Sequence, residues 1–273
     1  MADKLRVGFL GAGPVTQAIH LPSLARLPEF TITRVFDVND RTATAVADQV
    51  GAVPVSSADQ LLNSGDVDVV AICSPHQFHA EQVIAACESD VKAILCEKPF
   101  AVDMDQARAI ATVAHQTQTP IQVGAMHSFD PGVEALTQSW GDLPGSVHRV
   151  HSSIVLPPNS RFEDVATEII GRAPSKPAKL NDHEAAAVTV RMGMLGLATH
   201  DLPLIRRLVG DGPLTVRSAR ALPAFGYRVV VEAGQTSVVL HAAMTQNWQP
   251  DWRLRAWSQE AMVDIAFTPS YVH

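Results

Sequence analysis

The chain of 273 residues contains little cysteine, no long apolar run and no excess of basic charge. Its three cysteines, Cys73, Cys87 and Cys96, are an odd number without metal-binding spacing, so we interpret them as reduced, buried thiols of a cytoplasmic protein. The longest apolar run, near residues 67–73, is too short to cross a bilayer. The N-terminal residues lead directly into a strand-like segment, which leaves no room for a signal peptide.

Acidic residues outnumber basic ones, 28 to 21, which gives a formal net charge of −7. Nucleic acid and anionic membranes both need a basic face, so neither is expected as a partner. The content of hydrophobic residues, 47%, and the mean hydropathy of +0.09 are typical of a globular protein.

The first half of the chain alternates between strand and helix patterns. Repeated βα units of this kind predict a parallel sheet with helices on both faces and a ligand crevice at the carboxyl ends of the strands. We assign residues 1–123 to this domain. Its strands are expected at residues 5–10, 31–36, 53–55, 67–73, 93–96 and 121–123.

The pattern changes after Gly124, and we assign residues 124–273 to a second domain of α+β type. Strands that follow one another across short turns predict a mostly antiparallel sheet. Residues 157–182 are rich in proline and polar side chains and are expected to form a loop. Helices are expected at 133–140 and 193–209, and strands at 146–156, 214–222, 227–232, 237–243, 252–257 and 262–267.

A glycine-rich turn, GAGPVT at residues 11–16, follows the first strand and opens a helix. Gly11 allows the tight turn, and Gly13 lets the backbone approach a pyrophosphate at the helix N-terminus, with Pro14 and Val15 beside it. The third position is usually Gly or Ala and is Thr16 here. This context predicts a Rossmann domain that binds a nicotinamide dinucleotide.

Asp37 ends the second strand, 21 residues after Thr16. A carboxylate at this place accepts hydrogen bonds from the ribose hydroxyls and repels a 2′-phosphate, so NAD is expected over NADP. NADP remains possible because Arg41 lies four residues further on. Asp37 could alternatively cap the helix that begins near Asp40.

Three further stretches strengthen this prediction. They are DVVAICSP at residues 68–75 followed by His79, CEKP at 96–99, and GMLGLATHDLP at 193–203. With the glycine-rich turn, they resemble the glucose–fructose oxidoreductase, inositol dehydrogenase and rhizopine catabolism (Gfo/Idh/MocA) family. The resemblance is good over residues 5–131, weaker to about 210, and a strand pattern only beyond that.

The resemblance implies hydride transfer between NAD(P) and a carbinol of a small-molecule substrate, usually a sugar or polyol. It places Ser74, Pro75, His79, Glu97 and Lys98 at the cofactor, with Lys98 also contacting the substrate hydroxyl. It makes His200 the general acid/base. It further implies that the open face of the second sheet forms a homodimer or higher oligomer.

His127 lies in a substrate-side segment, GAMHSFDP at residues 124–131, in which many family members carry arginine where this chain has Ser128. We therefore count His127, with Lys98 and His200, among the substrate-binding residues. His20 and His76 lie near the predicted crevice but receive no role. No metal is expected.

The chain departs from the family pattern around His200. The usual Asp four residues earlier, on the same helix face, is Gly196, which can neither orient an imidazole nor stabilise its cation. Asp201 is adjacent but about 100° round the helix. Pro203 is expected to kink or restart the helix. The chain also ends earlier than family members usually do.

These departures leave two alternatives open beside an NAD-dependent dehydrogenase. The first is a catalytically weak dinucleotide-binding regulator. The second is a reductase of a non-sugar substrate, such as a tetrapyrrole or an imine, for which the Asp–His pair matters less.

Overall fold

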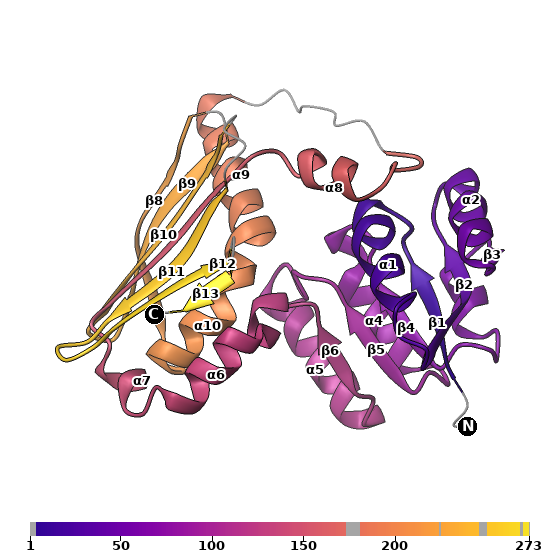
Figure 1. The fold of residues 1–273 in the computed structure, drawn as a ribbon, viewed down its shortest axis with the longest axis horizontal. Coiled ribbons are helices and arrows are strands. Elements are labelled where there is room, and N and C mark those ends of the chain that lie inside the picture. The colour runs from indigo at the N-terminus through magenta and orange to yellow at the C-terminus, as the bar shows by residue number, and fades with distance from the viewer. Residues whose placement is uncertain (1–3, 173–180, 224, 246–249, 268–269, 273) are drawn as a thin grey trace. The chain divides into compact units, whose positions relative to one another are not determined.

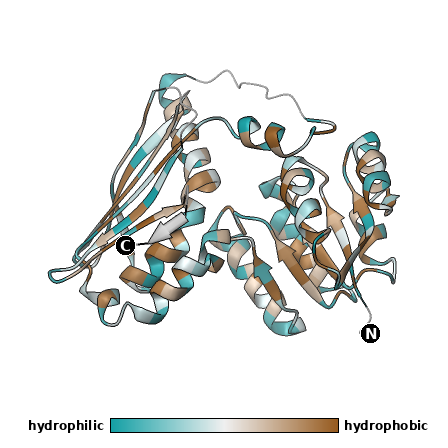
Figure 2. Ribbon diagram, in the orientation of Figure 1, coloured by the Kyte–Doolittle hydropathy of each residue, from teal (hydrophilic) through white to brown (hydrophobic). Residues whose placement is uncertain are grey.

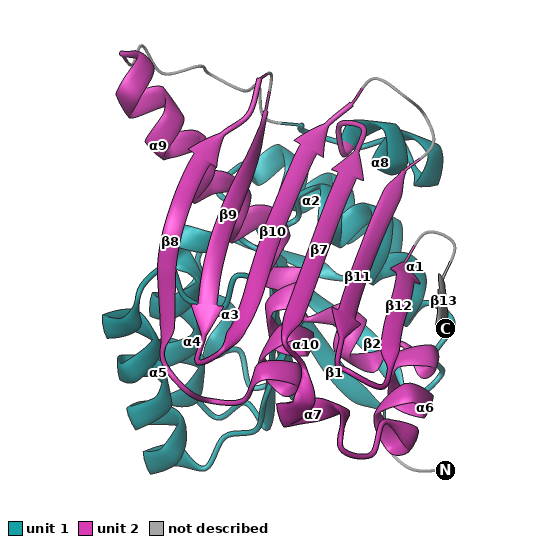
Figure 3. Cartoon of the chain, turned by 90° about the vertical axis from the view of Figure 1, so that its left-hand side faces the viewer, with its two compact units in different colours: residues 1–124, 160–176 teal, residues 125–159, 177–273 magenta. Residues whose placement is uncertain are grey.

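The computed structural model describes residues 4–172, 181–223, 225–245, 250–267 and 270–272 (Figure 1). The chain divides into two compact units (Figure 3). Unit 1 comprises Met1–Gly124 and Ser160–Lys176, and unit 2 comprises Ala125–Asn159 and Pro177–His273. The sequence analysis had placed the whole of residues 124–273 in the second domain, whereas the structure groups Ser160–Lys176 with the first.

Unit 1 is built on a six-stranded sheet in the order β3-β2-β1-β4-β5-β6, and all of its strand pairs are parallel. Because chain order reverses between β1 and β4, the carboxyl ends of these two strands flank the ligand-binding crevice of such a sheet. The strands are β1 Leu5–Leu10, β2 Phe30–Phe36, β3 Val53–Val55, β4 Val69–Ile72, β5 Ala93–Cys96 and β6 Ile121–Val123.

Continuous apolar runs explain these central strands, since helices bury both of their faces (Figure 2). Side chains of Asn39, Ser57 and Asp103 cap three of the helices by accepting backbone N–H bonds. The helices are η1 Thr16–His20, α1 Leu21–Leu24, α2 Asp40–Val50, α3 Ala58–Leu62, η2 His76–Phe78, α4 His79–Cys87 and α5 Met104–Thr117.

A later segment of the chain completes unit 1. Residues 157–182 were predicted to be a loop, but α8 (Ser160–Ala166) is a helix within this stretch. The side chain of Gln17 binds the backbone of Ile170 twice, accepting from its N–H at 2.8 Å and donating to its carbonyl at 3.0 Å. This long-range pairing fixes a segment whose own sequence carries no clear helical pattern.

Unit 2 contains a seven-stranded sheet in the order β13-β12-β11-β7-β10-β9-β8. Only the central pair β10–β7 is parallel, so the prediction of a mostly antiparallel sheet is confirmed. The strands are β7 Arg149–Leu156, β8 Leu214–Ala221, β9 Gly226–Ala233, β10 Thr236–Met244, β11 Asp251–Trp257, β12 Met262–Phe267 and β13 Ser270–Val272.

Alternate residues of these strands point into one core, which the unit's helices close from the same side. Leu204, Ile205 and Leu208 line the buried face of the helix Thr199–Val209, and Val133 adds a second helix. The helices are η3 Met126–Phe129, α6 Pro131–Ser139, α7 Leu143–Ser146, α9 Asp182–Gly193, η4 Met194–Ala198 and α10 Thr199–Val209.

One expectation about the helix around His200 was wrong. The helical region begins at Asp182 rather than Gly193, behind a capping box formed by Asn181 and Glu184. Helix α10 also continues through Pro203 to Val209, because the buried face of α10 outweighs the one hydrogen bond that proline removes. No described helix is long and apolar enough to traverse a bilayer.

Candidate functional site

The glycine-rich turn of unit 1 has the geometry of a phosphate-binding loop. Gly11 has φ +98°, and a Cβ there would lie 2.7 Å from the Ser74 nitrogen, so only glycine fits. A Cβ on Gly13 would meet nothing within 4 Å, so protein packing does not explain this glycine. The close approach of a pyrophosphate to the backbone explains why glycine is needed at this position. Thr16 is buried, and its hydroxyl donates to the Gly11 carbonyl at 2.7 Å, which accommodates the departure at the third position.

Asp37 stands at the end of β2 and helps to hold this turn. One carboxylate oxygen accepts the Ala12 N–H and the other the Asn39 N–H, both at 2.9 Å. The cap of α2 is Asn39, so the alternative role of Asp37 as a helix cap is wrong. A cavity of about 230 Å³ opens beside Asp37 and is lined by Gly11, Phe36, Val38, Ser74, Pro75, Phe78 and Gln82.

His79 lies behind the loops that line this cavity. It is buried, and its ring nitrogens lie 2.8 Å from the carbonyl oxygens of Pro99 and Ser74. It therefore ties the β4 loop to the β5 loop instead of lining the cavity. Ser74 and Pro75 do line the cavity, and the Ser74 hydroxyl donates to Gln82 at 2.6 Å.

Glu97 and Lys98 follow β5 in the same unit. Glu97 accepts the Lys98 N–H at 3.2 Å, and its other oxygen lies 2.9 Å from Nε2 of His20. The sequence analysis gave His20 no role, yet the fold brings it from the glycine-rich helix to the Glu-Lys-Pro motif across 77 positions. Its place soon after the glycine-rich turn was the only signal in the sequence.

Burial and pairing shift the ionisation of these groups. Burial alone lowers the pKa of His20, but hydrogen bonds with Cys73 and Glu97 outweigh burial and raise this pKa to about 10. Burial opposes ionisation of Glu97, yet contact with His20 keeps the pKa of that carboxyl below its usual value. Burial lowers the pKa of Lys98, and the charge of Glu97 only partly offsets this effect. The amine of Lys98 is thereby brought closer to the range in which it can exchange a proton.

His127 and His200 lie together in unit 2. Both are buried, with ring centroids 5.6 Å apart and planes at 40°. His127 stacks on Phe267 at 3.7 Å, and Trp252 meets the edges of both imidazoles. Asp201, which we had judged a poor substitute for the missing carboxylate, is fully buried and lies 3.4 Å from Nδ1 of His127. No three His, Cys, Asp or Glu side chains are placed to hold a metal ion in the described chain.

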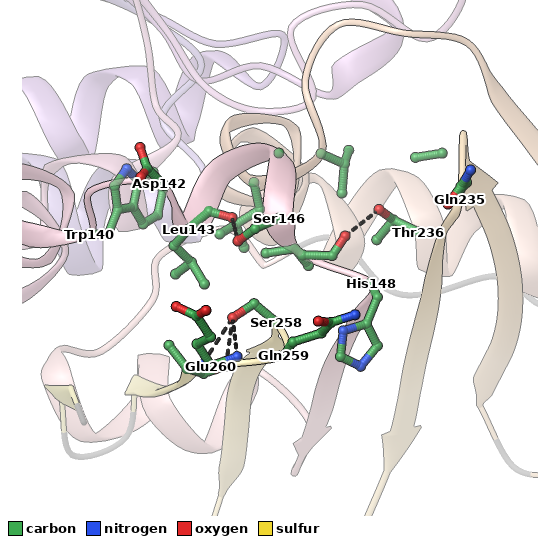
Figure 4. Close-up of a pocket in the computed structure, with 16 residues that line it drawn as sticks. Trp140, Asp142, Leu143, Ser146, His148, Gln235, Thr236, Ser258, Gln259 and Glu260 are labelled. Atoms are coloured by element: carbon green, nitrogen blue, oxygen red, sulfur yellow. Dashed lines mark hydrogen bonds between the residues drawn. The ribbon is translucent and has the colours of Figure 1, made fainter.

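A second, larger cavity of about 900 Å³ lies at the hairpin end of the unit 2 sheet (Figure 4). Its hydroxyl groups serve the protein: Thr236 donates to the Val147 carbonyl, and Ser258 accepts the N–H groups of Glu260 and Ala261. Neither His127 nor His200 lines this cavity. It is therefore separate from the predicted chemistry.

Comparison with known proteins supports the same interpretation. The sequence model of an oxidoreductase family with an NAD-binding Rossmann fold, Gfo/Idh/MocA, matches residues 5–125. Inositol 2-dehydrogenase of Arthrobacter sp. (strain FB24) is 32% identical over 245 residues, which cover 85% of this chain and 72% of that protein. Inositol 2-dehydrogenase 3 of Saccharopolyspora erythraea is 33% identical over 159 residues, or 56% of this chain and 46% of its own.

Solved structures share the fold of the whole chain. UDP-N-acetylglucosamine 3-dehydrogenase from Acidithiobacillus ferrooxidans superposes with a TM-score of 0.76 at 23% identity, over 100% of this chain and 80% of that one. The two-unit architecture is therefore shared with an enzyme about a fifth of which has no counterpart in this chain.

Proposed function

Because this chain belongs to the Gfo/Idh/MocA family of NAD-binding oxidoreductases, we propose that it oxidises a secondary alcohol of a cyclic polyol or sugar, with inositols as the first candidates. The observation that carries the proposal is the half-buried Glu97 and Lys98, which follow β5 in the same unit as the glycine-rich turn. The two relatives named as inositol dehydrogenases supply the substrate class.

The residues of unit 1 fit the dinucleotide. Gly13 leaves room for the pyrophosphate. Asp37 lines a cavity in which its carboxylate can accept hydrogen bonds from the hydroxyls of the adenosine ribose. NAD, when bound, supplies the hydride acceptor. Glu97 holds the loop that carries Lys98, and Lys98 polarises the substrate hydroxyl and shares its proton. His200, a buried imidazole, takes up that proton as general base, with His127 beside it.

The test is NADH formation measured against a panel of inositol isomers, hexoses and nucleotide sugars at several pH values. We expect turnover with at least one cyclic polyol or sugar and none with simple aliphatic alcohols. Tight NAD binding without turnover on any member of the panel would instead favour a dinucleotide-binding regulator. The absence of a side chain at Gly196 is the observation on which that second candidate rests.

We also propose that the chain forms a homodimer through the open face of its second sheet and works in the cytoplasm. The helices of unit 2 pack on one face, and the opposite face carries alternate residues of strands β7 to β12 (Figure 3). The three cysteines are free thiols, which suits a reducing compartment.

A further inference from the structure

Asp201 is a fully buried carboxylate whose two oxygens contact three side chains. The Ser152 hydroxyl donates to one oxygen at 2.6 Å, and the Trp252 indole N–H donates to the other at 2.9 Å. The oxygen that accepts the indole N–H also lies 3.4 Å from Nδ1 of His127. A buried anion is costly unless hydrogen bonds and a counter-charge compensate for it, so a proton on a neighbouring imidazole would stabilise this carboxylate.

Two imidazoles are available to carry that proton. The rings of His127 and His200 are 5.6 Å apart, and Trp252 meets them edge-on at 4.5 and 5.1 Å. Asp201 therefore holds His127 directly and holds His200 through the indole that it binds.

Several neutral groups contact the cluster. Ser152 on β7 and Trp252 on β11 carry no charge, and Phe267 on β12 closes the stack. Burial, followed by the negative charge of Asp201, raises the pKa of Tyr227 on β9, so this phenol stays protonated. Asp201 is thus a carboxylate in direct contact with the imidazole pair, and its negative charge would favour a proton on that pair.

We propose that Asp201 is the positioning residue for His200, acting through His127 and Trp252, and that it supplies the negative charge for which Gly196 has no side chain. The inference deepens the proposed function and rests on it, because it assigns the group that tunes the general base. Sequence spacing argued against this role, since Asp201 points to a different side of the helix from His200. The network reaches His200 through residues of other elements instead.

The fold also offers a means of restoring the family's arrangement. A Cβ at Gly196 would meet nothing within 4 Å, so a side chain can be introduced there without a clash. Gly196→Asp places a carboxylate one helical turn before His200. If Asp201 performs the role of the family's Asp, a carboxylate introduced at position 196 should partly replace that of Asp201.

The experiment uses the full chain and two readouts. The first is NMR titration of the His127 and His200 imidazoles, assigned with the variants His127→Asn and His200→Asn. The second is the pH profile of kcat and kcat/KM for NAD reduction. In Asp201→Asn we expect the imidazole pair to lose its proton at least one pH unit lower, a tenfold change in proton affinity. We also expect kcat to fall about tenfold or more, with KM within about threefold.

The double variant Gly196→Asp/Asp201→Asn should recover part of the lost kcat and return the titration toward that of the unmodified chain. Asp182→Asn, at the exposed first turn of α9, is the matched loss of one carboxylate and should change neither readout. If Asp201→Asn does not fold, Trp252→Phe removes the indole N–H that binds Asp201 but leaves the carboxylate charge. The less compensated charge should then make the imidazole pair hold its proton more tightly, so the titration should shift in the opposite direction. Unchanged imidazole titrations in the folded variant would overturn the inference.

The titration needs no substrate, so it separates this inference from the proposed function. A substrate panel without turnover would overturn the alcohol dehydrogenase while leaving the tuning of the imidazole pair measurable. If Asp201→Asn keeps both full turnover and unchanged imidazole titrations, the role of Asp201 is overturned and the proposed function is not.

Discussion

Single residues carry the chemistry of this chain, and several carry more than one role. Asp37 was predicted from its distance to the glycine-rich turn, and in the fold it also accepts the Ala12 N–H that shapes that turn. His79 was grouped with the cofactor, and its ring nitrogens contact two loop carbonyls. Spacing along the chain identifies which residues reach a site, whereas the contacts decide what each one does there.

Removal of the Lys98 amine should separate binding from turnover. We expect Lys98→Ala to keep NADH affinity close to that of the unmodified chain and to lower kcat by about 10² or more, because its amine shares the proton of the substrate hydroxyl. Fluorescence titration and initial rates measure the two effects. Lys92→Ala, an exposed lysine of the same unit, is the control. Turnover that hardly changes would make Lys98 structural.

The carboxylate of Asp37 should set the choice of cofactor. We expect NADH to bind at least tenfold tighter than NADPH, about 1.4 kcal/mol, because a 2′-phosphate would meet this negative charge. Titration of both cofactors by fluorescence decides the point. Arg41→Ala should leave the ratio unchanged. If NADH and NADPH bind equally well to the unmodified chain and unequally to Arg41→Ala, then Arg41 recognises the 2′-phosphate.

The pairing of His20 with Glu97 should make stability depend on pH with a definite sign. The pKa of His20 is raised from 6.5 to about 10, so the stability that it contributes is full below pH 6.5 and is lost as the pH rises through 10. Urea unfolding of His20→Gln should therefore show its largest deficit at pH 6 and almost none at pH 10. His115→Gln, on an exposed helix position, serves as the control. A deficit independent of pH would contradict the ion pair.

At the scale of elements, short irregular segments place the functional side chains. Two π-helical turns lie close to histidines of the candidate site. The turn Thr16–His20 ends at His20, and the turn Met194–Ala198 ends two residues before His200. Such turns recur at functional sites because they alter the register in which side chains leave a helix. Periodicity arguments assume a regular helix, so the sequence could not predict either turn.

The segment with α8 should detach from unit 1 when its closest contact is blocked. Gly171 has φ +70°, and a Cβ there would collide with Oγ1 of Thr42. Gly51 has the same φ, but a Cβ there would meet nothing within 4 Å. Each change to alanine should cost about 1–2 kcal/mol for the left-handed backbone. Only Gly171→Ala should also increase hydrogen exchange over residues 160–172. Equal exchange in both variants would contradict this docking.

At the scale of the whole molecule, the second sheet has one face that the described helices of its unit do not cover. Arg253 and Arg255 both reach Asp264 across neighbouring strands, and the Arg149 guanidinium lies 4.0 Å above the Trp257 ring. These pairs satisfy part of the polar surface within one chain. Aliphatic side chains between them, such as Val155 and Val239, remain available for contact with a second copy.

We expect this face to bring two chains together at micromolar concentration. Val239→Glu, at the centre of the sheet, should shift the mass measured by light scattering after size exclusion from a dimer to a monomer. Val165→Glu, on exposed α8, should not. A monodisperse monomer of the unmodified chain would show that the open face is polar enough to remain in water.

The sequence by itself determined the features that depend on neighbouring residues. The apolar runs of unit 1, the glycine-rich turn and the acidic end of β2 all lie within 37 residues of one another or repeat regularly, so the parallel sheet and its NAD site were predictable. Tertiary structure alone decided the pairs His20–Glu97, Gln17–Ile170 and His127–Asp201, which join positions 77, 153 and 74 residues apart. Local propensity cannot encode such contacts, because they form only when packing of the whole chain buries both partners together.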